Sequence, residues 1–420
     1  MTILLVIIAA IFTSQSVFAD IADDIKLCLQ QSQQADLEPL LLRALDQHVS
    51  LDELQQIAEE CNNQSLIYAI KTTKKVKERI AFVSVRDFLQ AALFIETRLQ
   101  DYIEQEQYYL PKDTTGLSYA LEYDPTTRAH FIILEGKEAE LGSGKMKVVT
   151  KAIYYTHKNP KLVARAEQTS PMDKELEITK LTANFPGMFE TLGFGSHYEG
   201  NTLHTTIYSK LYNPGSLEVM YESGQRLSLY EQVKVALNIV KGLEALHKAG
   251  IVHRDLGARN YLVHIPSGKK GRRDVVGCIA DLGRADYIEN VAHSKVQGNT
   301  TYTAPEGIFL DKMTGESYYK SDVFAVGCVF YRLIHGRKGM WQNPHHVKDT
   351  FIPAKERYKM KVQLLEIATK SRRDMLKRKA NRSNEEEFEY VVLGMLEAHP
   401  EKRESARSAR IKMERLFERL

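Results

Sequence analysis

The sequence predicts an α+β protein in which a small all-α domain precedes a strand-rich lobe and a helical lobe. Three successive patterns along the chain support this fold class. Residues 20–110 have helical periodicity, β-rich segments follow "LPKDTTG" at Leu110–Gly116, and helices dominate again from about Leu229. Of the 420 residues, 43% are hydrophobic and 26% charged, as in ordinary globular proteins. The formal net charge of +3 gives no general reason to expect nucleic acid as a partner.

The first 20 residues, "MTILLVIIAAIFTSQSVFAD", combine an apolar run with a small-x-small triplet that ends at Ala19. This pattern predicts a signal peptide over residues 1–19 and therefore an exported protein. The run from Ile3 to Phe12 is too short to span a bilayer and lacks the usual basic flank, so an uncleaved anchor is the alternative. Charged residues interrupt every later apolar run, so no membrane span is expected after cleavage.

The stretch "SLDELQQIAEE" is typical of the all-α domain. Ser50 and Glu53 have the spacing of a capping box, and Leu51, Leu54 and Ile57 share one helical face. Nothing in this domain has the spacing of a metal or catalytic site, so its role and any partner stay open.

If the protein is exported, its cysteines can form disulfides, because disulfides persist in oxidising compartments. Cys28 and Cys61 are a candidate disulfide, and two free thiols are the alternative. Cys278 and Cys328 lie in apolar runs and are expected to be small core residues.

The polar stretch "HRDLGARN", His253 to Asn260, lies between two elements that we expect to be buried. A helix with apolar residues on one face precedes it and ends at Gly250, and strand-like "NYLV" follows. Further along, Asp281 directly follows another apolar strand in "CIADLGRAD". The stretch is therefore expected to be a loop that is held in place by its neighbours.

These motifs, in this order, resemble those of the protein kinase superfamily. The set is His253-Arg254-Asp255 with Asn260, an Asp-Leu-Gly at Asp281 in place of Asp-Phe-Gly, and Ala304-Pro305-Glu306. The resemblance implies a bilobal protein kinase fold over residues 118–420. It also implies that Arg403 pairs with Glu306 as a structural staple and that Asp322 lies in a central buried helix.

The resemblance implies phosphoryl transfer from ATP with Mg²⁺. Asn260 and Asp281 carry the hard oxygen ligands that Mg²⁺ prefers. Asp255 would act as the catalytic base on the attacking hydroxyl. Arg254 would contact the activation segment.

The nucleotide loop "LGSGKMKVV" fits the family only in part. Leu141, Gly142, Gly144 and Val149 match the family's Gly-rich loop, but Lys147 occupies the place of its third glycine. We expect these five residues to contact the nucleotide.

The next strand, "LVARAEQ", lacks the family's phosphate-binding lysine. Ala164 is placed beside the nucleotide, and Ala166 stands where the lysine should be. Three interpretations are open: the chain is an inactive kinase, Arg165 replaces the lysine, or a lysine comes from another strand. The with-no-lysine kinases carry their lysine where Lys147 stands, and adjacent strands are only ~4.8 Å apart, which favours Lys147. Strand alternation turns Arg165 to the opposite face.

Such a cation needs a carboxylate, and Glu175 resembles the glutamate of the family's αC helix, with Glu177 as the alternative. The sequence therefore predicts a Lys147–Glu175 pair. The stretch "IYSKLYNPGSLEVM" resembles the hinge, which places the backbone around Leu211 next to the adenine.

The predicted function is an exported, ATP-dependent protein kinase with a protein substrate. Gly257 stands in place of the lysine usual in Ser/Thr kinases, and Arg259 is placed as in tyrosine kinases. Because "GNTTYTAPE" follows the spacing of Ser/Thr kinases, the acceptor hydroxyl stays open. A pseudokinase that acts as a protein-binding module is the alternative, supported by Ala166. Because the destination must contain ATP, delivery into a host cell is our hypothesis for its localisation.

Overall fold

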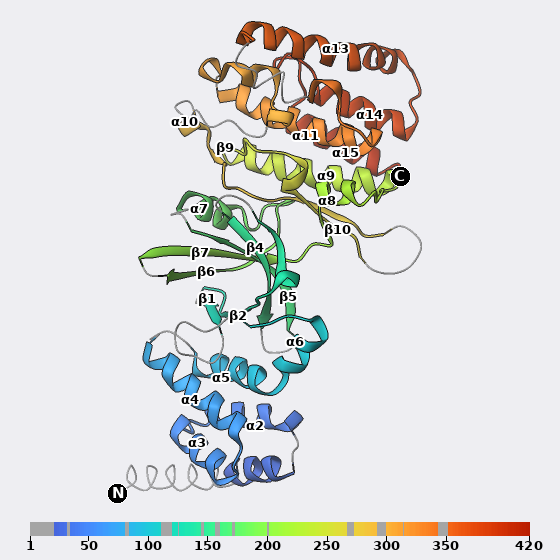
Figure 1. The fold of residues 1–420 in the computed structure, drawn as a ribbon. Coiled ribbons are helices and arrows are strands. Elements are labelled where there is room, and N and C mark those ends of the chain that lie inside the picture. Colours follow the sequence, from blue (N-terminus) through green and yellow to red (C-terminus); the bar gives the residue numbers. More distant parts are fainter. Residues whose placement is uncertain are drawn as a thin grey trace, which may run out of the picture. The chain divides into compact units, whose positions relative to one another are not determined.

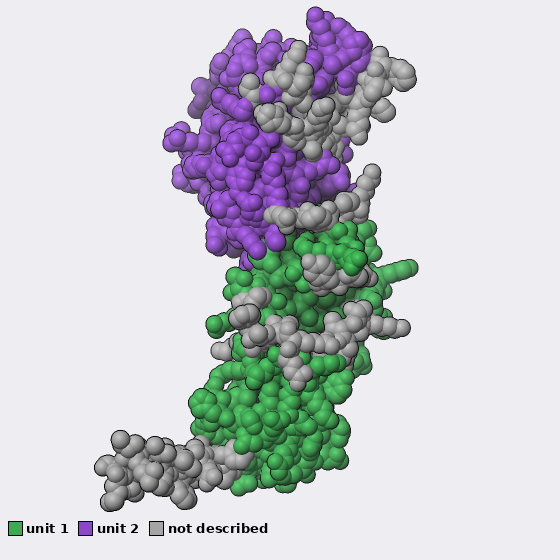
Figure 2. Space-filling model, turned by 90° about the vertical axis from the view of Figure 1, so that its left-hand side faces the viewer, with its two compact units in different colours: residues 1–170, 192–208 green, residues 171–191, 209–420 purple. Residues whose placement is uncertain are grey.

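The computed structural model describes residues 21–31, 34–79, 84–110, 120–124, 126–143, 147–155, 160–169, 173–199, 201–266, 273–291, 300–313, 315–342 and 352–420. These residues form two compact units (Figure 2). Unit 1 comprises residues 1–170 and 192–208, and unit 2 comprises residues 171–191 and 209–420. Each unit is described by itself.

Unit 1 begins with helices, as the sequence predicts (Figure 1). Residues 21–30 are helical and are followed by α2 (Gln34–Asp46), α3 (Leu51–Glu60), α4 (Gln64–Arg79), α5 (Val85–Phe94), the π-helical turn η1 (Ile95–Leu99) and α6 (Gln100–Glu106). The predicted capping box is confirmed: the Ser50 N–H donates to Glu53 Oε2 at 2.8 Å and the Glu53 N–H to Ser50 Oγ at 3.2 Å. Cys28 and Cys61, the candidate disulfide, are not joined by a disulfide bond in this structure.

The sheet of unit 1 has seven strands in the order β1-β2-β4-β5-β7-β6, with β3 beside β4. They are β1 (Leu121–Asp124), β2 (Ala129–Ile133), β3 (Glu140–Ser143), β4 (Lys147–Tyr155), β5 (Lys161–Gln168), β6 (Thr191–Glu199) and β7 (Thr202–Lys210). Strands β2 and β3 pair with successive parts of β4, and residues 134–139 separate the two strands. Strand β1 is an addition beyond β2.

Helices α5 and α6 share a hydrophobic core with this sheet. Phe94 and Tyr155 stack with ring centroids 4.8 Å apart, and Ile103 lies in the same buried cluster as Ile153. The predicted boundary between the helical domain and the kinase domain lies within residues 111–119, outside the described residues, and stays a prediction.

Unit 2 is mainly helical, as predicted (Figure 1). Its elements are α7 (Asp173–Thr182), β8 (Pro214–Ser216), α8 (Leu217–Glu222), α9 (Leu229–Lys248), β9 (Ile251–Val252), β10 (Tyr261–His264), β11 (Val276–Ile279), β12 (Asp286–Tyr287), α10 (Ile288–Val291), α11 (Gly315–His335), α13 (Ala354–Arg378), α14 (Asn384–Met395) and α15 (Ala406–Phe417), with short 3₁₀ turns between them. Helix α9 ends just before Gly250, whose φ of +75° suits glycine and turns the chain into β9.

The predicted staple is confirmed. Arg403 donates from both terminal nitrogens to Glu306, at 2.6 and 3.0 Å, and its side chain is fully buried. Asp322 lies in α11, a largely buried helix. Among the described residues, no helix is both long and apolar enough to cross a membrane.

Candidate active site

The loop between β9 and β10 is fixed from α11. The backbone N–H groups of His253 and Arg254 donate to the two carboxylate oxygens of Asp322, at 2.8 and 3.0 Å. His253 is fully buried, and its Nε2 lies 3.2 Å from the carbonyl oxygen of Ala280. Arg254 has a φ of +65°, a conformation that non-glycine residues rarely adopt and that these contacts hold in place. His253 is therefore a packing residue, as expected.

Asp255, Asn260 and Asp281 meet through a short network. Asn260 donates from Nδ2 to the Asp255 carbonyl at 2.7 Å, and its own carbonyl accepts the Ala280 N–H at 2.8 Å. Asp281 follows directly and has a φ of +61°. The structure thus brings together the three residues that the sequence assigns to metal and proton transfer.

The donor set fits Mg²⁺. Because Asn260 uses its amide N–H group on Asp255, its amide oxygen is left for a cation, and Asp281 adds carboxylate oxygens. Within the described ranges, no cluster of three or more His, Cys, Asp and Glu is placed to hold a metal. Mg²⁺ sites often use one or two protein ligands together with nucleotide phosphates.

Glu175 in α7 is buried and lies beside the Asp-Leu-Gly motif. A Cβ atom on Gly283 would stand 3.0 Å from Glu175 Oε2 and 3.4 Å from Asp281 Oδ1, so both carboxylates approach this glycine. Glu177, the alternative, instead accepts a hydrogen bond from the Tyr287 hydroxyl at 2.9 Å. The geometry within unit 2 favours Glu175 as the glutamate that faces the site.

Asp286 joins α7 to the catalytic loop, and sequence reasoning missed it. Its carboxylate forms an ion pair with Lys174 through one oxygen and lies 3.5 Å from Arg254 Nη2 through the other. Arg254 Nε donates to the Arg284 carbonyl at 2.8 Å, and its expected contact with the activation segment stays a prediction. Burial lowers the Arg254 pKa, and the nearby Asp286 opposes this shift. Only the position of Asp286, five residues after Asp281, could have drawn attention to it.

Lys147, at the start of β4, lies on the same face of the sheet as Ala166, as the hypothesis of a lysine from another strand requires. Val149 pairs with Ala166 and Lys151 with Ala164, so Lys147, Val149 and both alanines share a face. Lys147 is half-buried. It belongs to unit 1 and Glu175 to unit 2, so their ion pair stays a prediction.

Arg165 pairs with Thr150 and points to the opposite face. Its guanidinium is buried and donates to Glu167 at 2.8 Å and to Glu122 at 3.1 Å. The Tyr208 hydroxyl donates to the same Glu122 at 2.7 Å. Arg165 therefore lies on the face that strand alternation predicts, and its charge is taken up by an internal ion-pair network.

The remaining predicted nucleotide contacts are only partly placed. Leu141 is exposed in β3, Gly142 pairs with Val149, and Gly144 lies outside the described residues. Next to Leu211, the Lys210 N–H donates to the Glu190 carbonyl at 3.0 Å, which ties the hinge segment to the chain before β6.

The packing around residue 257 explains why it is a glycine. A Cβ atom there would stand 2.9 Å from the ring of Tyr302, which is buried, and burial raises the Tyr302 pKa. Tyr302 therefore packs its ring against the catalytic loop.

A bilobal chain with these catalytic motifs has the features of a protein kinase. Residues 136–412 match the family model for the protein kinase domain, which is more than half of the chain. The chain therefore belongs to the protein kinase family.

Curated relatives agree with this assignment. Dual specificity testis-specific protein kinase 2 of Homo sapiens is 30% identical over 167 residues, which cover 39% of this chain and 27% of that protein. PTI1-like tyrosine-protein kinase 3 of Arabidopsis thaliana is 28% identical over 228 residues, 48% of this chain and 51% of that protein. Mitogen-activated protein kinase kinase kinase 17 of Arabidopsis thaliana is 34% identical over 115 residues, 27% of this chain and 28% of that protein. The matched regions span about half or less of these relatives.

Proposed function

We propose that this protein is an active kinase that transfers the γ-phosphoryl group of ATP to a protein hydroxyl. The observation that carries the proposal is the network that joins Asp255, Asn260 and Asp281 through the Asp255 carbonyl and the Ala280 N–H. A chain without catalytic duty has no chemical need to keep all three groups in one arrangement.

Each residue has a definite task in this reaction. Asp255 accepts or orients the proton of the attacking hydroxyl. Asn260 and Asp281 hold Mg²⁺, which when bound neutralises charge on the phosphates. Lys147 supplies the cation that Ala166 cannot, and Glu175 holds that cation in place.

The acceptor stays open between Ser/Thr and Tyr. The relatives include a protein named as a dual specificity kinase and one named as a tyrosine-protein kinase. Gly257 bears on this choice only through packing, because the Tyr302 ring occupies the space beside it.

The test uses protein that begins at Asp20, Mg²⁺ and γ-labelled ATP. Wild type should label itself or a generic protein substrate, and Asp255→Ala should lose the label. Asp274→Ala is the matched control, since the Asp274 side chain is exposed and pairs only with Lys234 among the described residues. Equal silence of wild type and Asp255→Ala over several substrates would favour the pseudokinase alternative.

Nucleotide binding separates these outcomes further. Saturating ATP with Mg²⁺, at 100 times its dissociation constant, should stabilise the fold by ~2.7 kcal/mol, and removal of Mg²⁺ or Asp281→Asn should lower that gain. A binding module without a nucleotide site would show no shift in its melting temperature.

We also propose export, on the sequence of residues 1–20 alone, with delivery into an ATP-containing compartment such as a host cell. These residues lie outside the described part of the chain. The proposal expects a mature chain beginning at Asp20 in the exported fraction. An unprocessed chain confined to the cytosol of the producing cell would contradict it.

A further inference from the structure

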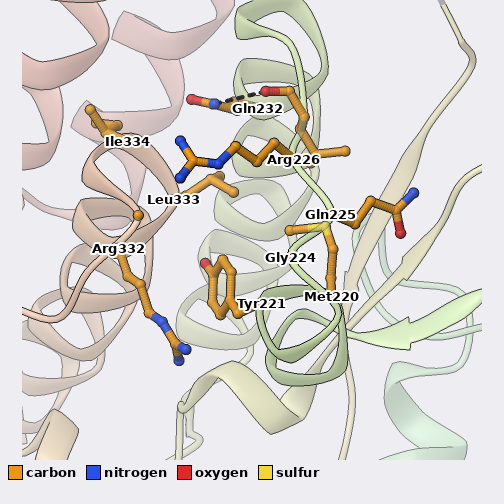
Figure 3. Close-up of a pocket in the computed structure, with 11 residues that line it drawn as sticks. Met220, Tyr221, Gly224, Gln225, Arg226, Gln232, Arg332, Leu333 and Ile334 are labelled. Carbon is orange, nitrogen blue, oxygen red and sulfur yellow. Dashed lines mark hydrogen bonds between the residues drawn. The ribbon is translucent and has the colours of Figure 1, made fainter.

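A cavity of about 310 Å³ lies in unit 2. It is formed by the end of α8, the loop that leads to α9, and the end of α11 (Figure 3). Met220, Leu227 and Leu333 are buried side chains that give it an apolar lining. Its volume is within the range of small-ligand sites, and it contains none of the residues assigned above to catalysis.

One wall of the cavity is held rigidly. Arg332 donates to both oxygens of Glu218, at 3.0 and 2.9 Å, and its guanidinium lies 4.1 Å from the ring centroid of Tyr221. The Tyr221 hydroxyl in turn donates to the Val329 carbonyl at 3.2 Å. The charge of Arg332 is therefore compensated within the fold, and this wall does not have to rearrange when a ligand binds.

Arg226 is different, because no described residue compensates its charge in this way. Its side chain is exposed, and no other described residue forms a hydrogen bond, an ion pair or a ring contact with it. Figure 3 shows its guanidinium directed across the cavity from the α8–α9 loop. A guanidinium nitrogen would lie 3.6 Å from a Cβ atom on Gly336, at the end of α11.

The loop that carries Arg226 is itself well fixed. Gly224 has a φ of +71° and donates its N–H to the Tyr221 carbonyl at 3.2 Å. Gln232 Nε2 donates to the Leu227 carbonyl at 2.9 Å, which ties the loop to the first turn of α9 (Figure 3). The guanidinium is thus presented from a backbone that is already ordered, which lowers the entropic cost of binding an anion.

We propose that this cavity binds a short acidic peptide segment in which a carboxylate lies next to an aliphatic side chain. The carboxylate pairs with Arg226 through the bidentate geometry that guanidinium groups favour. The aliphatic side chain enters the space over Leu227 and Leu333. A free anion would use only the first of these features, and an uncharged apolar ligand only the second.

The test measures fluorescence anisotropy of a labelled decapeptide of alternating glutamate and leucine, with its glutamine–leucine twin as the ligand control. Wild type should bind the glutamate peptide, and Arg226→Glu should weaken that binding about tenfold or more. Arg337→Glu is the matched protein control: it makes the same charge change on an exposed arginine near the end of α11 that does not line the cavity. Melting curves of both variants should match wild type.

Three results would overturn the proposal: equal binding of the glutamine twin, equal losses in Arg226→Glu and Arg337→Glu, or full displacement of the peptide by inorganic phosphate at the same concentration. The measurement is independent of catalysis, because Asp255→Ala protein should bind the peptide as wild type does. An inactive chain that still binds the peptide would refute the proposed kinase activity and leave this site standing.

Discussion

The catalytic loop of unit 2 follows the family's motif, whereas strands β4 and β5 of unit 1 depart from it at the lysine position. In the loop, each functional residue is at the family's position, and the backbone around it is hydrogen-bonded, as Asp322 shows for His253 and Arg254. In the strands, the family's lysine position is Ala166, and Lys147 stands on the neighbouring strand. The difference leads us to expect that backbone contacts tie a catalytic residue to its position, whereas a charge that only has to reach one point can be supplied from a neighbouring strand.

The largest effect should come from Asp322→Ala. It leaves two backbone N–H groups in the loop without their acceptor, each at a cost of about 1–3 kcal/mol, and releases the strained Arg254 backbone. We expect a loss of activity of at least roughly 100-fold, because misplacement of catalytic groups by about 1 Å has that effect. Initial rates and melting temperature, measured together, check this.

Asp322→Asn is the companion variant, since it keeps one carbonyl acceptor and nearly the same volume. It should retain more activity than Asp322→Ala. Activity of Asp322→Ala within about twofold of wild type, an effect of less than about 0.5 kcal/mol, would show that the loop does not depend on α11.

The relocated lysine gives the next largest effect. Lys147→Ala should lower the rate roughly 100-fold, the typical cost of removing one preorganised group that stabilises transition-state charge. Adding Ala166→Lys to that variant should restore part of the loss, because both positions share one face of the sheet. Rate measurements at saturating ATP and at low ATP check both variants.

Lys161→Ala is the control for the lysine exchange, since Lys161 is an exposed lysine at the other end of β5. It should leave the rate unchanged. If Lys147→Ala kept full activity, Lys147 would be an ordinary surface lysine of β4. If the double variant stayed as slow as Lys147→Ala, exchange between the two strands would be refuted.

A smaller effect is expected from Asp286, whose carboxylate contacts both α7 and the catalytic loop. Asp286 contacts Lys174, which precedes Glu175, and Arg254, which precedes Asp255. Asp286→Asn should therefore lower kcat about tenfold through positioning, with partial recovery in Asp286→Glu. Combining it with Lys174→Ala should cost less than the sum of the two single effects, and a double-mutant cycle measures this. Strictly additive losses would mean that Lys174 and Asp286 act independently.

Local patterns made part of the fold and part of the candidate active site predictable from the sequence. The Ser50 capping box, the end of α9 before Gly250 and the spacing from Asp255 to Asn260 depend on residues close together in the chain. The side of the sheet on which Arg165 lies follows from strand alternation alone.

Contacts between distant segments could not be predicted in this way. The ion pair of Lys174 with Asp286 joins residues that are far apart in the chain, and neither residue has a distinctive local pattern. The same holds for the packing of α5 on the sheet, where Phe94 meets Tyr155. Such contacts depend on register and helix docking, which periodicity does not determine.

Unit 1 and unit 2 can also be compared through two buried cations, which should affect the stability of the fold in opposite directions. Arg165 in unit 1 pairs with Glu122 and Glu167, whereas Lys361 in α13 is fully buried and its Nζ has no hydrogen-bond partner among the described residues. Arg165→Met should destabilise the fold by about 3–5 kcal/mol, because it leaves carboxylates without their cation. Lys361→Met should act in the opposite direction and raise stability at neutral pH.

The size and pH dependence of the Lys361→Met effect follow from the lysine pKa. Burial lowers the pKa of Lys361 from 10.5 to about 8 in the folded protein, so below pH 8 folding must bury a charged amine. The penalty is about 3.5 kcal/mol at about 1.4 kcal/mol per pKa unit, and it fades as the pH rises from 8 towards 10.5. Chemical denaturation should therefore show that Lys361→Met is more stable than wild type at pH 7 and that the gap narrows by pH 10. Lys370→Met, on the exposed side of the same helix, should show no such trend, and a gap that stayed constant with pH would mean that packing rather than charge causes it.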